Sequence, residues 1–346
     1  MKAALYYGKE DIRIGTVPDP EIVLPTDAIV GITHSCICGS DLWFYRGYWP
    51  HWQEGYRTGH EWMGIVEAVG AEVKTVKKGD RVLAPFAFSD GKCEACEDGV
   101  PTSCYHGGFW GGENDGGQAE AIRAPFADAT LVKIPGNADN DRNLLKSLLL
   151  LTDVMGTGYH AAFSAGVRPG SVVAVVGDGA VGLCAVLSAK KLGAERIILL
   201  GSHDERIAIG RKFGATDIVK KRGEEAIDEI KSLTGHGVKY TLECVGTDVS
   251  MQTAVKITKP GGAIGYVGAP HGDNPLDLGY LFANNIRLSG GLAPVRNYIP
   301  ELMNDVVNGW IDPAPVLNLE VSLDDVPQGY AAMDNREAIK VMVVND

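Results

Sequence analysis

The sequence lacks any uninterrupted apolar run of the ~18 residues that a membrane-spanning helix requires. The longest candidate, residues 144–155, contains Lys146 and Asp153, and the first seven residues lack the long apolar core of a signal peptide. Positive charge is also in deficit, because 32 Lys and Arg residues stand against 44 Asp and Glu residues and the net charge is −12. A nucleic-acid partner would require a basic face. We therefore expect a cytoplasmic protein with no membrane or nucleic-acid partner.

Cysteine is scarce, and its spacing is informative. Seven cysteines are an odd number, and three of them fall within one twelve-residue window. In a reducing compartment such clustering indicates a metal more than disulfides. The spacing Cys93-x2-Cys96-x7-Cys104 lets three thiolates converge on one tetrahedral ion, and Asp90 is the natural fourth ligand. No position remains open for a substrate, so this would be a structural zinc site. The alternatives are a glutamate of the same loop as fourth ligand, or a metal-free loop with three reduced thiols.

The length of 346 residues favours two domains. The first 152 residues predict a β-rich domain, because short β-branched and aromatic segments alternate with Gly/Pro turns. Its expected strands are 3–7, 12–17, 28–35, 64–69, 81–84 and 118–123. From about residue 153 to 294, six apolar runs with intervening helical patterns predict a doubly wound parallel α/β sheet. The tail 295–346 lacks this alternation, and we expect it to pack on the first domain.

A glycine-rich turn, Gly177-Asp178-Gly179-Ala180-Val181-Gly182, follows the apolar strand 171–176 and opens a helix. A bare GxGxxG is a weak motif, but this strand–turn–helix context is the one that makes it informative. Gly177 permits the tight turn, Gly179 lets the backbone approach a pyrophosphate, and Gly182 lets helix and strand pack closely. The helix N-terminus then faces the anion. The motif predicts a dinucleotide site, with a mere turn as the alternative.

The end of the second strand of such a fold distinguishes the two nicotinamide cofactors, because an Asp or Glu there binds the ribose 2′-hydroxyl of NAD. Here Gly201 takes that position, which removes the charge that would repel a 2′-phosphate and leaves space for it. The neighbouring side chains that can bind a phosphate are Ser202, His203, Arg206 and Lys221. We therefore favour NADP(H) over NAD(H), with the alternative that Asp204 turns inward and serves NAD. A Gly201→Asp substitution should move the preference toward NAD.

Side chains with the chemistry of a catalytic zinc site occur in three segments: Cys38, His60 with Glu61, and Asp153. A catalytic zinc takes three protein ligands and leaves one position for water or substrate. Each residue alone is weak evidence, since a lone Cys is usually a small buried hydrophobe. Glu61 either ligates the metal when substrate and water are absent or acts from behind the ligands. Ser40 can take the proton of an alcohol and pass it to solvent through the cofactor ribose, or it can cap a helix that starts nearby.

These residues resemble the zinc-dependent alcohol dehydrogenases of the medium-chain dehydrogenase/reductase superfamily. The likeness covers essentially the whole chain and is carried by Gly59-His60-Glu61-x2-Gly64-x5-Gly70, by Cys38-Gly39-Ser40-Asp41 and by the glycine-rich turn. It implies a GroES-like β-rich catalytic domain formed by residues 1–152 and 295–346. It also implies a Rossmann domain over residues 153–294 and an active site in the cleft between the two. Asp153 stands where the family supplies its last zinc ligand, which is often a cysteine. An aspartate at this position resembles the branch of microbial NADP-dependent secondary alcohol dehydrogenases.

The resemblance implies further site residues. The positions at which family members approach the nicotinamide correspond to Val245, Gly246, Val267 and Gly268. Asp90 stands where the family's structural zinc site normally has a fourth cysteine. The secondary alcohol dehydrogenases carry an arginine at the position of His203. Trp43 stands where some members carry a proton-relay histidine, so proton release should depend on Ser40 and water.

The expected activity is reversible oxidation of a secondary or hydrophobic alcohol by hydride transfer to NADP(H). Aromatic residues crowd the segments 43–62 and 109–110, which predicts an aromatic-lined pocket, although core packing explains any one of them equally well. The alternatives are an NAD-dependent polyol or threonine dehydrogenase, a metal-free quinone reductase, and a nucleotide-binding protein without turnover. We expect a homodimer or homotetramer, since the strand at 286–289 can pair across a two-fold axis.

Overall fold

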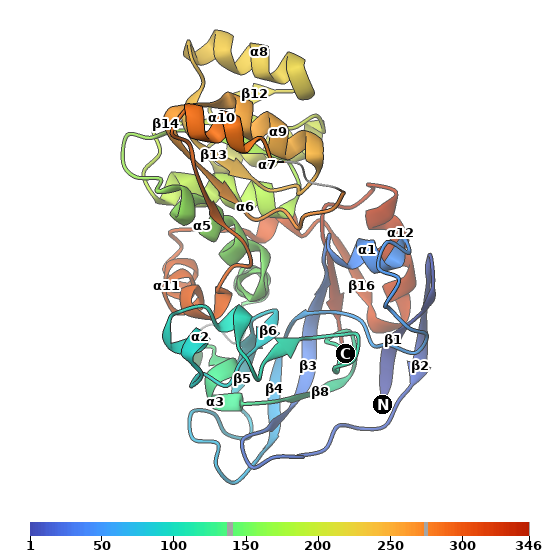
Figure 1. Cartoon of the computed structure of the whole chain (residues 1–346). Coiled ribbons are helices and arrows are strands. Elements are labelled where there is room, and N and C mark those ends of the chain that lie inside the picture. Colours follow the sequence, from blue (N-terminus) through green and yellow to red (C-terminus); the bar gives the residue numbers. More distant parts are fainter. Residues whose placement is uncertain (137–140, 273–275, 346) are drawn as a thin grey trace. The chain divides into compact units, whose positions relative to one another are not determined.

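The computed structural model describes residues 1–136, 141–272 and 276–345, and the chain divides into two units. The first unit comprises Met1–Asp153 and Pro294–Asp346, and the second comprises Val154–Ala293. Each unit is built on a large β-sheet of its own (Figure 1). No helix in the described part of the chain is long and apolar enough to cross a membrane.

Within the described residues, the first unit contains a seven-stranded sheet of order β16-β17-β3-β4-β5-β9, with β8 also pairing with β3. Its strands are β3 (Ala28–Ile37), β4 (Glu61–Val69), β5 (Arg81–Ala84), β8 (Ala121–Ala124), β9 (Val132–Lys133), β16 (Leu319–Ser322) and β17 (Val341–Val344). Only β16 and β17 are parallel neighbours; the other pairs are antiparallel. The predicted β-rich fold is therefore confirmed, although β4 begins three residues earlier than expected and includes Glu61.

Smaller elements surround this sheet. The strands are β1 (Lys2–Gly8), β2 (Asp11–Thr16), β6 (Ala87–Phe88) and β7 (Gly108–Phe109), which form the pairs β1-β2 and β6-β7. The helices are α1 (Asp41–Tyr45), α2 (Glu94–Glu97), α3 (Ala127–Thr130), α4 (Arg142–Leu149), α11 (Val295–Val307) and α12 (Val326–Asp334). Short 3₁₀ turns lie at Pro101–Ser103, Leu150–Thr152, Ala314–Val316 and Leu323–Asp325.

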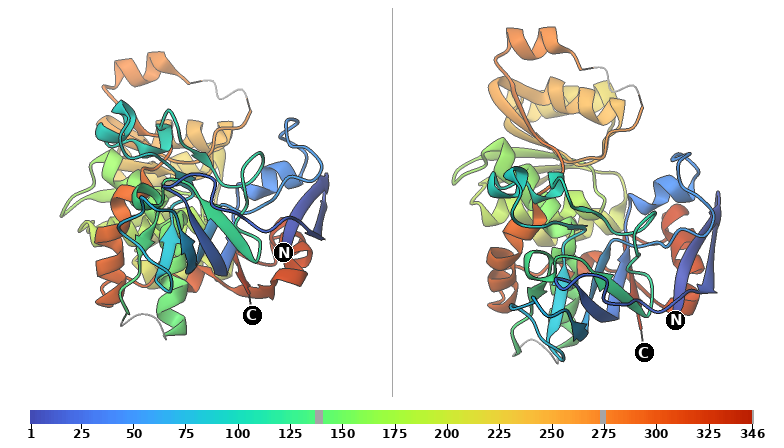
Figure 2. Two further views of the ribbon diagram at one scale, coloured as in Figure 1. Left: turned by 90° about the horizontal axis from the view of Figure 1, so that it is seen from below. Right: turned by 60° about the horizontal axis from the view of Figure 1, so that its bottom comes forward.

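The C-terminal segment returns to the first unit, because β17 pairs antiparallel with β3 and α12 packs beside β2 (Figures 1 and 2). Helix α12 was not predicted from the sequence. It contains Gly329, which lowers helix propensity. A Cβ at Gly329 would lie 2.7 Å from Ile37 Cδ1, so the missing side chain lets the helix pack closely on the strand.

The second unit contains a six-stranded sheet in the described chain, with order β12-β11-β10-β13-β14-β15. The strands are β10 (Val172–Val176), β11 (Arg196–Leu200), β12 (Asp217–Val219), β13 (Val238–Glu243), β14 (Thr258–Tyr266) and β15 (Arg287–Gly290). All neighbouring strands are parallel. Numbered along the chain, this is the order 3-2-1-4-5-6 of a doubly wound dinucleotide-binding fold, which confirms the predicted fold class.

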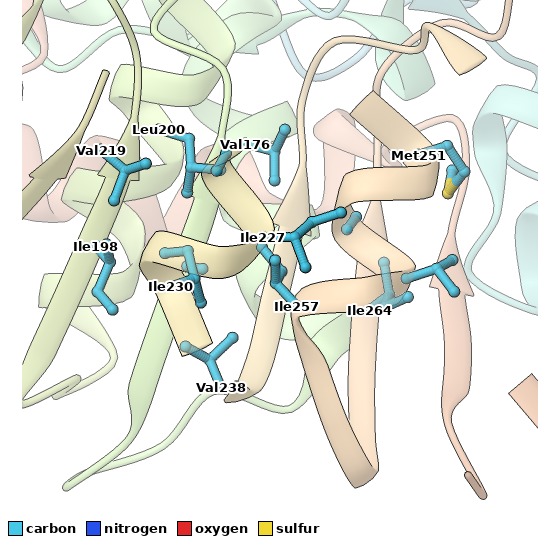
Figure 3. Close-up of a cluster of buried hydrophobic side chains, with 14 of the residues drawn as sticks. Val176, Ile198, Leu200, Val219, Ile227, Ile230, Val238, Met251, Ile257 and Ile264 are labelled. Carbon is cyan, nitrogen blue, oxygen red and sulfur yellow. The ribbon is translucent and has the colours of Figure 1, made fainter. Parts of the chain in front are cut away.

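Helices cover both faces of this parallel sheet. They are α5 (Val154–Ala165), α6 (Ala180–Lys191), α7 (Asp204–Phe213), α8 (Gly223–Thr234), α9 (Asp248–Ile257) and α10 (Leu278–Ala283). Apolar side chains of α8 and α9, among them Ile227, Ile230 and Ile257, pack against Ile198 and Ile264 of the sheet (Figure 3). This continuous apolar face explains why the strand–helix alternation was readable from the sequence.

Candidate metal centres and nucleotide cradle

The strand register of the first unit brings Cys38 and His60 together. β3 and β4 are antiparallel neighbours with Cys36 opposite Glu61. Cys38, which follows β3, and His60, which precedes β4, therefore lie at the same end of the strand pair. Asp153 arrives from the turn before α5. One ligand atom from each of Cys38, His60, Glu61 and Asp153 lies within 4.8 Å of all the others, and we call these four residues the buried cluster.

The atom separations in the buried cluster match the edges of a zinc coordination tetrahedron. Asp153 Oδ2 lies 3.5 Å from Cys38 Sγ and 3.3 Å from His60 Nε2. Bond lengths of ~2.3 Å to sulfur and ~2.0–2.1 Å to nitrogen or oxygen give tetrahedral edges of about 3.3–3.6 Å for these atom pairs. Glu61 Oε1 lies farther out, at 3.9 Å from His60 Nε2. The set Cys38, His60 and Asp153 therefore fits zinc, with Glu61 behind it.

Two charged side chains, Asp41 and Lys340, contact members of the buried cluster and hold them in place. Asp41 Oδ1 lies 3.0 Å from His60 Nδ1, and a second carboxylate oxygen of Asp41 accepts the Cys38 backbone N–H at 2.9 Å. Lys340 Nζ donates to Glu61 Oε1 at 2.5 Å, and both side chains are almost fully buried, at 1% and 0% exposure. Within the described structure, Glu61 Oε2 is buried without a hydrogen-bond partner. Sequence reasoning missed Lys340, which lies 279 residues from Glu61.

Negative groups outnumber positive ones around the buried cluster. Burial raises the pKa of the Cys38 thiol, and the positive charge of Lys340 only partly opposes this shift. For His60, burial lowers the imidazole pKa, but the charges of Asp41 and Cys38 outweigh burial and raise that pKa well above its usual value. A divalent cation would compensate this excess of acidic groups, and its binding would release the thiol proton. The chemistry of the donor set therefore agrees with its geometry.

The structure departs from two expectations: one concerns the capping role of Ser40, and the other the pocket expected from the aromatic residues. Ser40 precedes α1, but its side chain makes no capping hydrogen bond, so the capping role is wrong. Several of the aromatic residues pack against one another in the core: Phe44 and Trp52 stack at 3.7 Å between ring centroids, and Trp62 packs edge-on against Trp110 at 5.1 Å. Others, among them Tyr48 and Phe109, are exposed. The ring edge-on to His60 belongs to Phe86, at 6.5 Å, a residue that the aromatic run did not include.

A second group, the loop cluster, consists of Asp90, Cys93, Cys96 and Cys104. Cys93 Sγ lies 3.6 Å from Cys96 Sγ and 3.7 Å from Cys104 Sγ. Asp90 Oδ1 lies 3.4 Å from Cys96 Sγ and 3.3 Å from Cys104 Sγ. Two thiolates on one zinc are about 3.8 Å apart at ~2.3 Å per bond. The loop cluster thus fits a tetrahedral zinc with no open position, and Asp90 supplies the fourth donor.

Backbone groups fix the carboxylate of the loop cluster. Asp90 Oδ1 accepts the backbone N–H groups of Lys92 at 2.9 Å and Cys93 at 3.0 Å. The other oxygen, Oδ2, contacts His106 Nδ1 at 2.5 Å. Burial raises the pKa of Asp90, but these hydrogen bonds outweigh burial and lower it far below its usual range. His106 follows Cys104 by two residues and was not predicted, because the C-x2-C-x7-C spacing ends at Cys104.

The glycine-rich turn of the second unit has the backbone that its sequence predicts. Gly177 adopts φ +114°, a conformation that favours glycine. A Cβ at Gly182 would lie 2.0 Å from the Gly177 carbonyl oxygen, so only glycine lets α6 start this close to β10. Gly179 is the N-cap of α6, and no side chain caps this helix. A Cβ at Gly179 would meet nothing within 4 Å. The first N–H groups of α6, from Ala180 and Val181 onward, thus form a cradle that fits a pyrophosphate.

The space beside Gly201 is occupied, which corrects one expectation. A Cβ at Gly201 would lie 2.5 Å from Asp178 Cβ, so the carboxylate of the glycine-rich turn fills the place that the sequence predicted to be open. A Gly201→Asp substitution would collide with Asp178 and does not test the cofactor preference cleanly. Asp204, the proposed alternative acid, is exposed and pairs with Lys220.

The predicted phosphate ligands are only partly brought together. His203 Nδ1 and Arg206 Nη1 lie 3.0 and 3.7 Å from the carboxylate of Asp178. Lys221, which lies two residues before α8, pairs at 2.9 Å with Glu225 of that helix. The cation that contacts Ser202 is Arg222, whose Nη2 donates to the Ser202 hydroxyl at 3.0 Å. Of the three consecutive cations 220–222, the one that contacts Ser202 is therefore Arg222 and not the predicted Lys221.

The turns that end β13 and β14 lie against each other. Val245 and Gly246 donate their backbone N–H groups to Glu243 Oε1 at 2.9 and 2.8 Å. Val267 and Gly268 donate theirs to the carbonyl oxygen of Glu243 at 2.9 and 3.2 Å. A Cβ at Gly268 would lie 2.2 Å from the Gly246 nitrogen. One buried glutamate thus fixes all four residues expected near a nicotinamide.

Comparisons with known proteins agree with both units. The model of the alcohol dehydrogenase GroES-like domain matches residues 24–136, and that of the zinc-binding dehydrogenase matches residues 180–308. An uncharacterized zinc-type alcohol dehydrogenase-like protein of Bacillus subtilis (strain 168) is 33% identical, with 99% of this chain and 100% of that protein covered. An alcohol dehydrogenase from Thermus sp. ATN1 superposes with a TM-score of 0.93 at 31% identity over 100% of both chains. A zinc-dependent alcohol dehydrogenase from Streptococcus pneumonia gives 0.92 at 34% identity, covering 100% of this chain and 99% of that one.

Proposed function

Because the chain belongs to the zinc-dependent alcohol dehydrogenase family of the medium-chain dehydrogenase/reductase superfamily, we propose that it interconverts a secondary or hydrophobic alcohol and its ketone or aldehyde with NADP(H). An oxidoreductase of the alcohol dehydrogenase type follows from the family; the substrate and the choice of NADP(H) are our proposals. The observation that carries the proposed alcohol oxidation is the buried cluster, whose donors have the separations of a zinc tetrahedron and leave one coordination position open.

Each residue of the buried cluster has a distinct role in this proposal. Zinc held by Cys38, His60 and Asp153 would lower the pKa of an alcohol ligand and polarise the carbonyl oxygen of the product. Asp41 accepts a hydrogen bond from the Nδ1–H of His60, which leaves Nε2 as the unprotonated, metal-facing nitrogen of a neutral imidazole. Lys340 holds Glu61 through Oε1, so Glu61 acts from behind the three ligands.

Ser40 is the proposed proton acceptor for the alcohol. It lies two residues after Cys38, and its hydroxyl is not used to cap α1. Ser40 Oγ would accept the hydroxyl proton of the alcohol during oxidation while its own proton passes to solvent through the cofactor ribose, and the same relay would run in reverse during reduction. Phe86, edge-on to His60 and stacked on Phe109 at 6.0 Å, provides the apolar wall that favours a hydrophobic substrate.

The second unit supplies the cofactor site of this proposal. A bound nicotinamide dinucleotide would supply the hydride chemistry, and the N–H groups at the start of α6 would bind its pyrophosphate. Ser202 and Arg222 support NADP(H), because a hydroxyl and a guanidinium meet at the end of β11. The carboxylate of Asp178 opposes a 2′-phosphate at the same place. The preference for NADP(H) is therefore proposed as a balance of these groups.

We also propose a cytoplasmic homo-oligomer. All seven cysteines are free, as expected in a reducing compartment. β15 is an edge strand of the six-stranded sheet, and the nearby Phe282 and Leu278 of α10 are exposed at 87% and 68%. An edge strand with apolar neighbours favours pairing with a second copy of the chain. Light scattering after size-exclusion chromatography gives the mass, and a Phe282→Glu variant should shift it toward the monomer.

The decisive experiment combines metal analysis with turnover. The full chain is assayed for reduction of NADP⁺ and NAD⁺ with secondary, primary and polyhydric alcohols and with threonine. We expect zinc in the protein and the highest kcat/KM with a secondary alcohol and NADP⁺. Highest turnover of polyols or threonine would replace the substrate class, and nucleotide binding without any turnover would refute the enzymatic proposal.

Ser40 is tested by Ser40→Ala, which should lower kcat by roughly 100-fold at unchanged zinc content. Ser35→Ala is the matched control, because it removes a buried hydroxyl from β3 outside the donor set. Full activity of the Ser40 variant would remove its role as proton acceptor.

A further inference from the structure

The carboxylate of Asp178 occupies the position that a side chain at Gly201 would take. A Cβ on Gly201 would lie 2.5 Å from Asp178 Cβ and 2.7 Å from its Oδ2. In this fold, an acid at the end of the second strand accepts a hydrogen bond from the 2′-hydroxyl of the adenosine ribose. β11 ends without such an acid, yet its place holds a carboxylate that arrives from the glycine-rich turn.

Asp178 is fixed and charged at this place. Its Oδ2 accepts the backbone N–H groups of Ser202 at 2.9 Å and His203 at 3.1 Å, and it lies 3.0 Å from His203 Nδ1. Burial raises the pKa of Asp178, but the hydrogen bonds from His203 and the charge of Arg206 outweigh burial and lower that pKa. The carboxylate is therefore ionised at neutral pH and tied to the loop after β11.

Arg222 acts in the opposite direction at the same loop. Its guanidinium donates to the Ser202 hydroxyl at 3.0 Å, and it forms no ion pair with any described residue. The two lysines before it are neutralised, Lys220 by Asp204 and Lys221 by Glu225. Arg222 is thus the cation available to a phosphate beside Ser202, while Asp178 repels that phosphate.

We propose that Asp178 is a specificity-determining residue that supplies the acid missing from β11 and limits the preference for NADP(H) created by Arg222. The inference rests on the proposed function only in that the glycine-rich turn binds a nicotinamide dinucleotide. A 2′-hydroxyl can donate a hydrogen bond to Asp178, whereas a 2′-phosphate at the same place meets a like charge. The preference is therefore set by two opposed side chains from different turns.

The test uses adenosine ligands that differ only in the 2′-phosphate. Dissociation constants of 2′,5′-ADP and 5′-AMP are measured by calorimetry on the full chain at fixed ionic strength. Asp178→Asn keeps an acceptor oxygen for the backbone N–H groups of Ser202 and removes the charge. Asp204→Asn is the matched control, because it removes an exposed carboxylate at the start of α7, directly after the loop that Asp178 contacts. Asp178→Ser repeats the test in a smaller side chain if the asparagine variant folds poorly.

We expect Asp178→Asn to tighten 2′,5′-ADP relative to 5′-AMP by about tenfold, and Arg222→Gln to shift this ratio about tenfold in the opposite direction. Asp204→Asn should leave the ratio within about twofold. An unchanged ratio in both Asp178 variants, or an equal shift in the control, would overturn the inference. Failure of the proposed function appears separately, as a zinc-loaded chain that binds these nucleotides but oxidises no alcohol.

Discussion

The two donor clusters of the first unit each offer four ligand atoms but are assembled in different ways. The buried cluster joins residues up to 115 positions apart, whereas the loop cluster lies within residues 90–104. Side chains support the buried cluster, chiefly Lys340 on Glu61 and Asp41 on His60. Backbone N–H groups support the loop cluster through Asp90.

This difference separates a site that depends on the whole fold from one that depends on a local segment. The buried cluster forms only when β3 and β4 are in register, the turn before α5 is docked, and Lys340 is carried back beside β17. The loop cluster needs only the turns around α2. We therefore expect the two clusters to respond independently to substitution, one in activity and the other in stability.

Loss of a ligand in the buried cluster should have the largest effect. Cys38→Ser replaces a thiolate with a weak zinc donor, so we expect kcat/KM for alcohol oxidation to fall by about 10⁴-fold, or roughly 5 kcal/mol of transition-state stabilisation. Metal analysis should show loss of one zinc while the loop cluster keeps its own. Cys36→Ala, which removes a buried thiol of β3 outside the donor set, should keep its zinc. Full activity of Cys38→Ser would break the assignment of the buried cluster.

The fold and the loop cluster were readable from the sequence because their signals are local. Apolar periodicity gave the strands and helices of the second unit, and the C-x2-C-x7-C spacing gave the loop cluster, which the structure brings together with Asp90. Helix α12 was not predicted, because Gly329 lowers the helix propensity of its sequence. Its stability comes from packing on Ile37, which no local pattern reveals.

The environment of the buried cluster was only partly readable. Cys38, His60 and Asp153 were recognised by residue type, and the resemblance to a family then supported Asp153 as the last ligand. The burial of Lys340 could not be predicted from the sequence, because lysine side chains are mostly exposed. Only the pairing of β17 with β3 buries this one. Asp178 was visible in the glycine-rich turn, yet nothing in the sequence placed its carboxylate beside Gly201.

Removal of Lys340 should have the next largest effect and tests how far the buried cluster depends on distant charge. Lys340→Met leaves the Glu61 carboxylate buried without its cation, which should lower the free energy of unfolding by roughly 3–5 kcal/mol. Urea denaturation of the first unit, followed by the fluorescence of the buried Trp62 and Trp110, measures this loss. Adding Glu61→Gln should recover a large part of it, because the double variant has no unpaired charge. Equal loss in the single and double variants would show that packing, not charge, carries the contribution of Lys340.

The loop cluster should give a smaller effect that appears in stability. Cys104→Ser removes one of its donors, so we expect loss of one zinc and a fall in Tm of roughly 5 °C, with activity at low temperature unchanged. Calorimetry and zinc content together measure this outcome. Cys244→Ser, a free cysteine of the second unit, controls for the general cost of the substitution. A parallel loss of activity would show that the two clusters are coupled and would break the comparison.

A partly exposed ion pair in the second unit serves as the comparison for the buried pair of Lys340 and Glu61. Its removal should have the smallest effect on stability. Arg196 contacts Asp217 through two hydrogen bonds at 2.9 and 2.7 Å, but both side chains are partly exposed, at 34% and 25%. This pairing lowers the pKa of Asp217 from 3.8 to about 2. Because the folded-state pKa lies below the unfolded one, the stabilisation is present above about pH 4 and is lost as pH falls toward 2.

Solvent screening limits this pair to about 1 kcal/mol or less. Asp217→Asn should therefore lower the free energy of unfolding by a nearly constant amount from pH 8 to about 4.5, and this difference from the native chain should shrink only at lower pH. Urea titrations at several pH values measure it. A difference that already shrinks between pH 7 and 5 would contradict the lowered pKa of Asp217. An exposed pair is weakened by solvent, whereas a buried carboxylate that loses its cation has no water to replace it. If Asp217→Asn lowered the free energy of unfolding as much as Lys340→Met does, burial would therefore not be what distinguishes the two ion pairs.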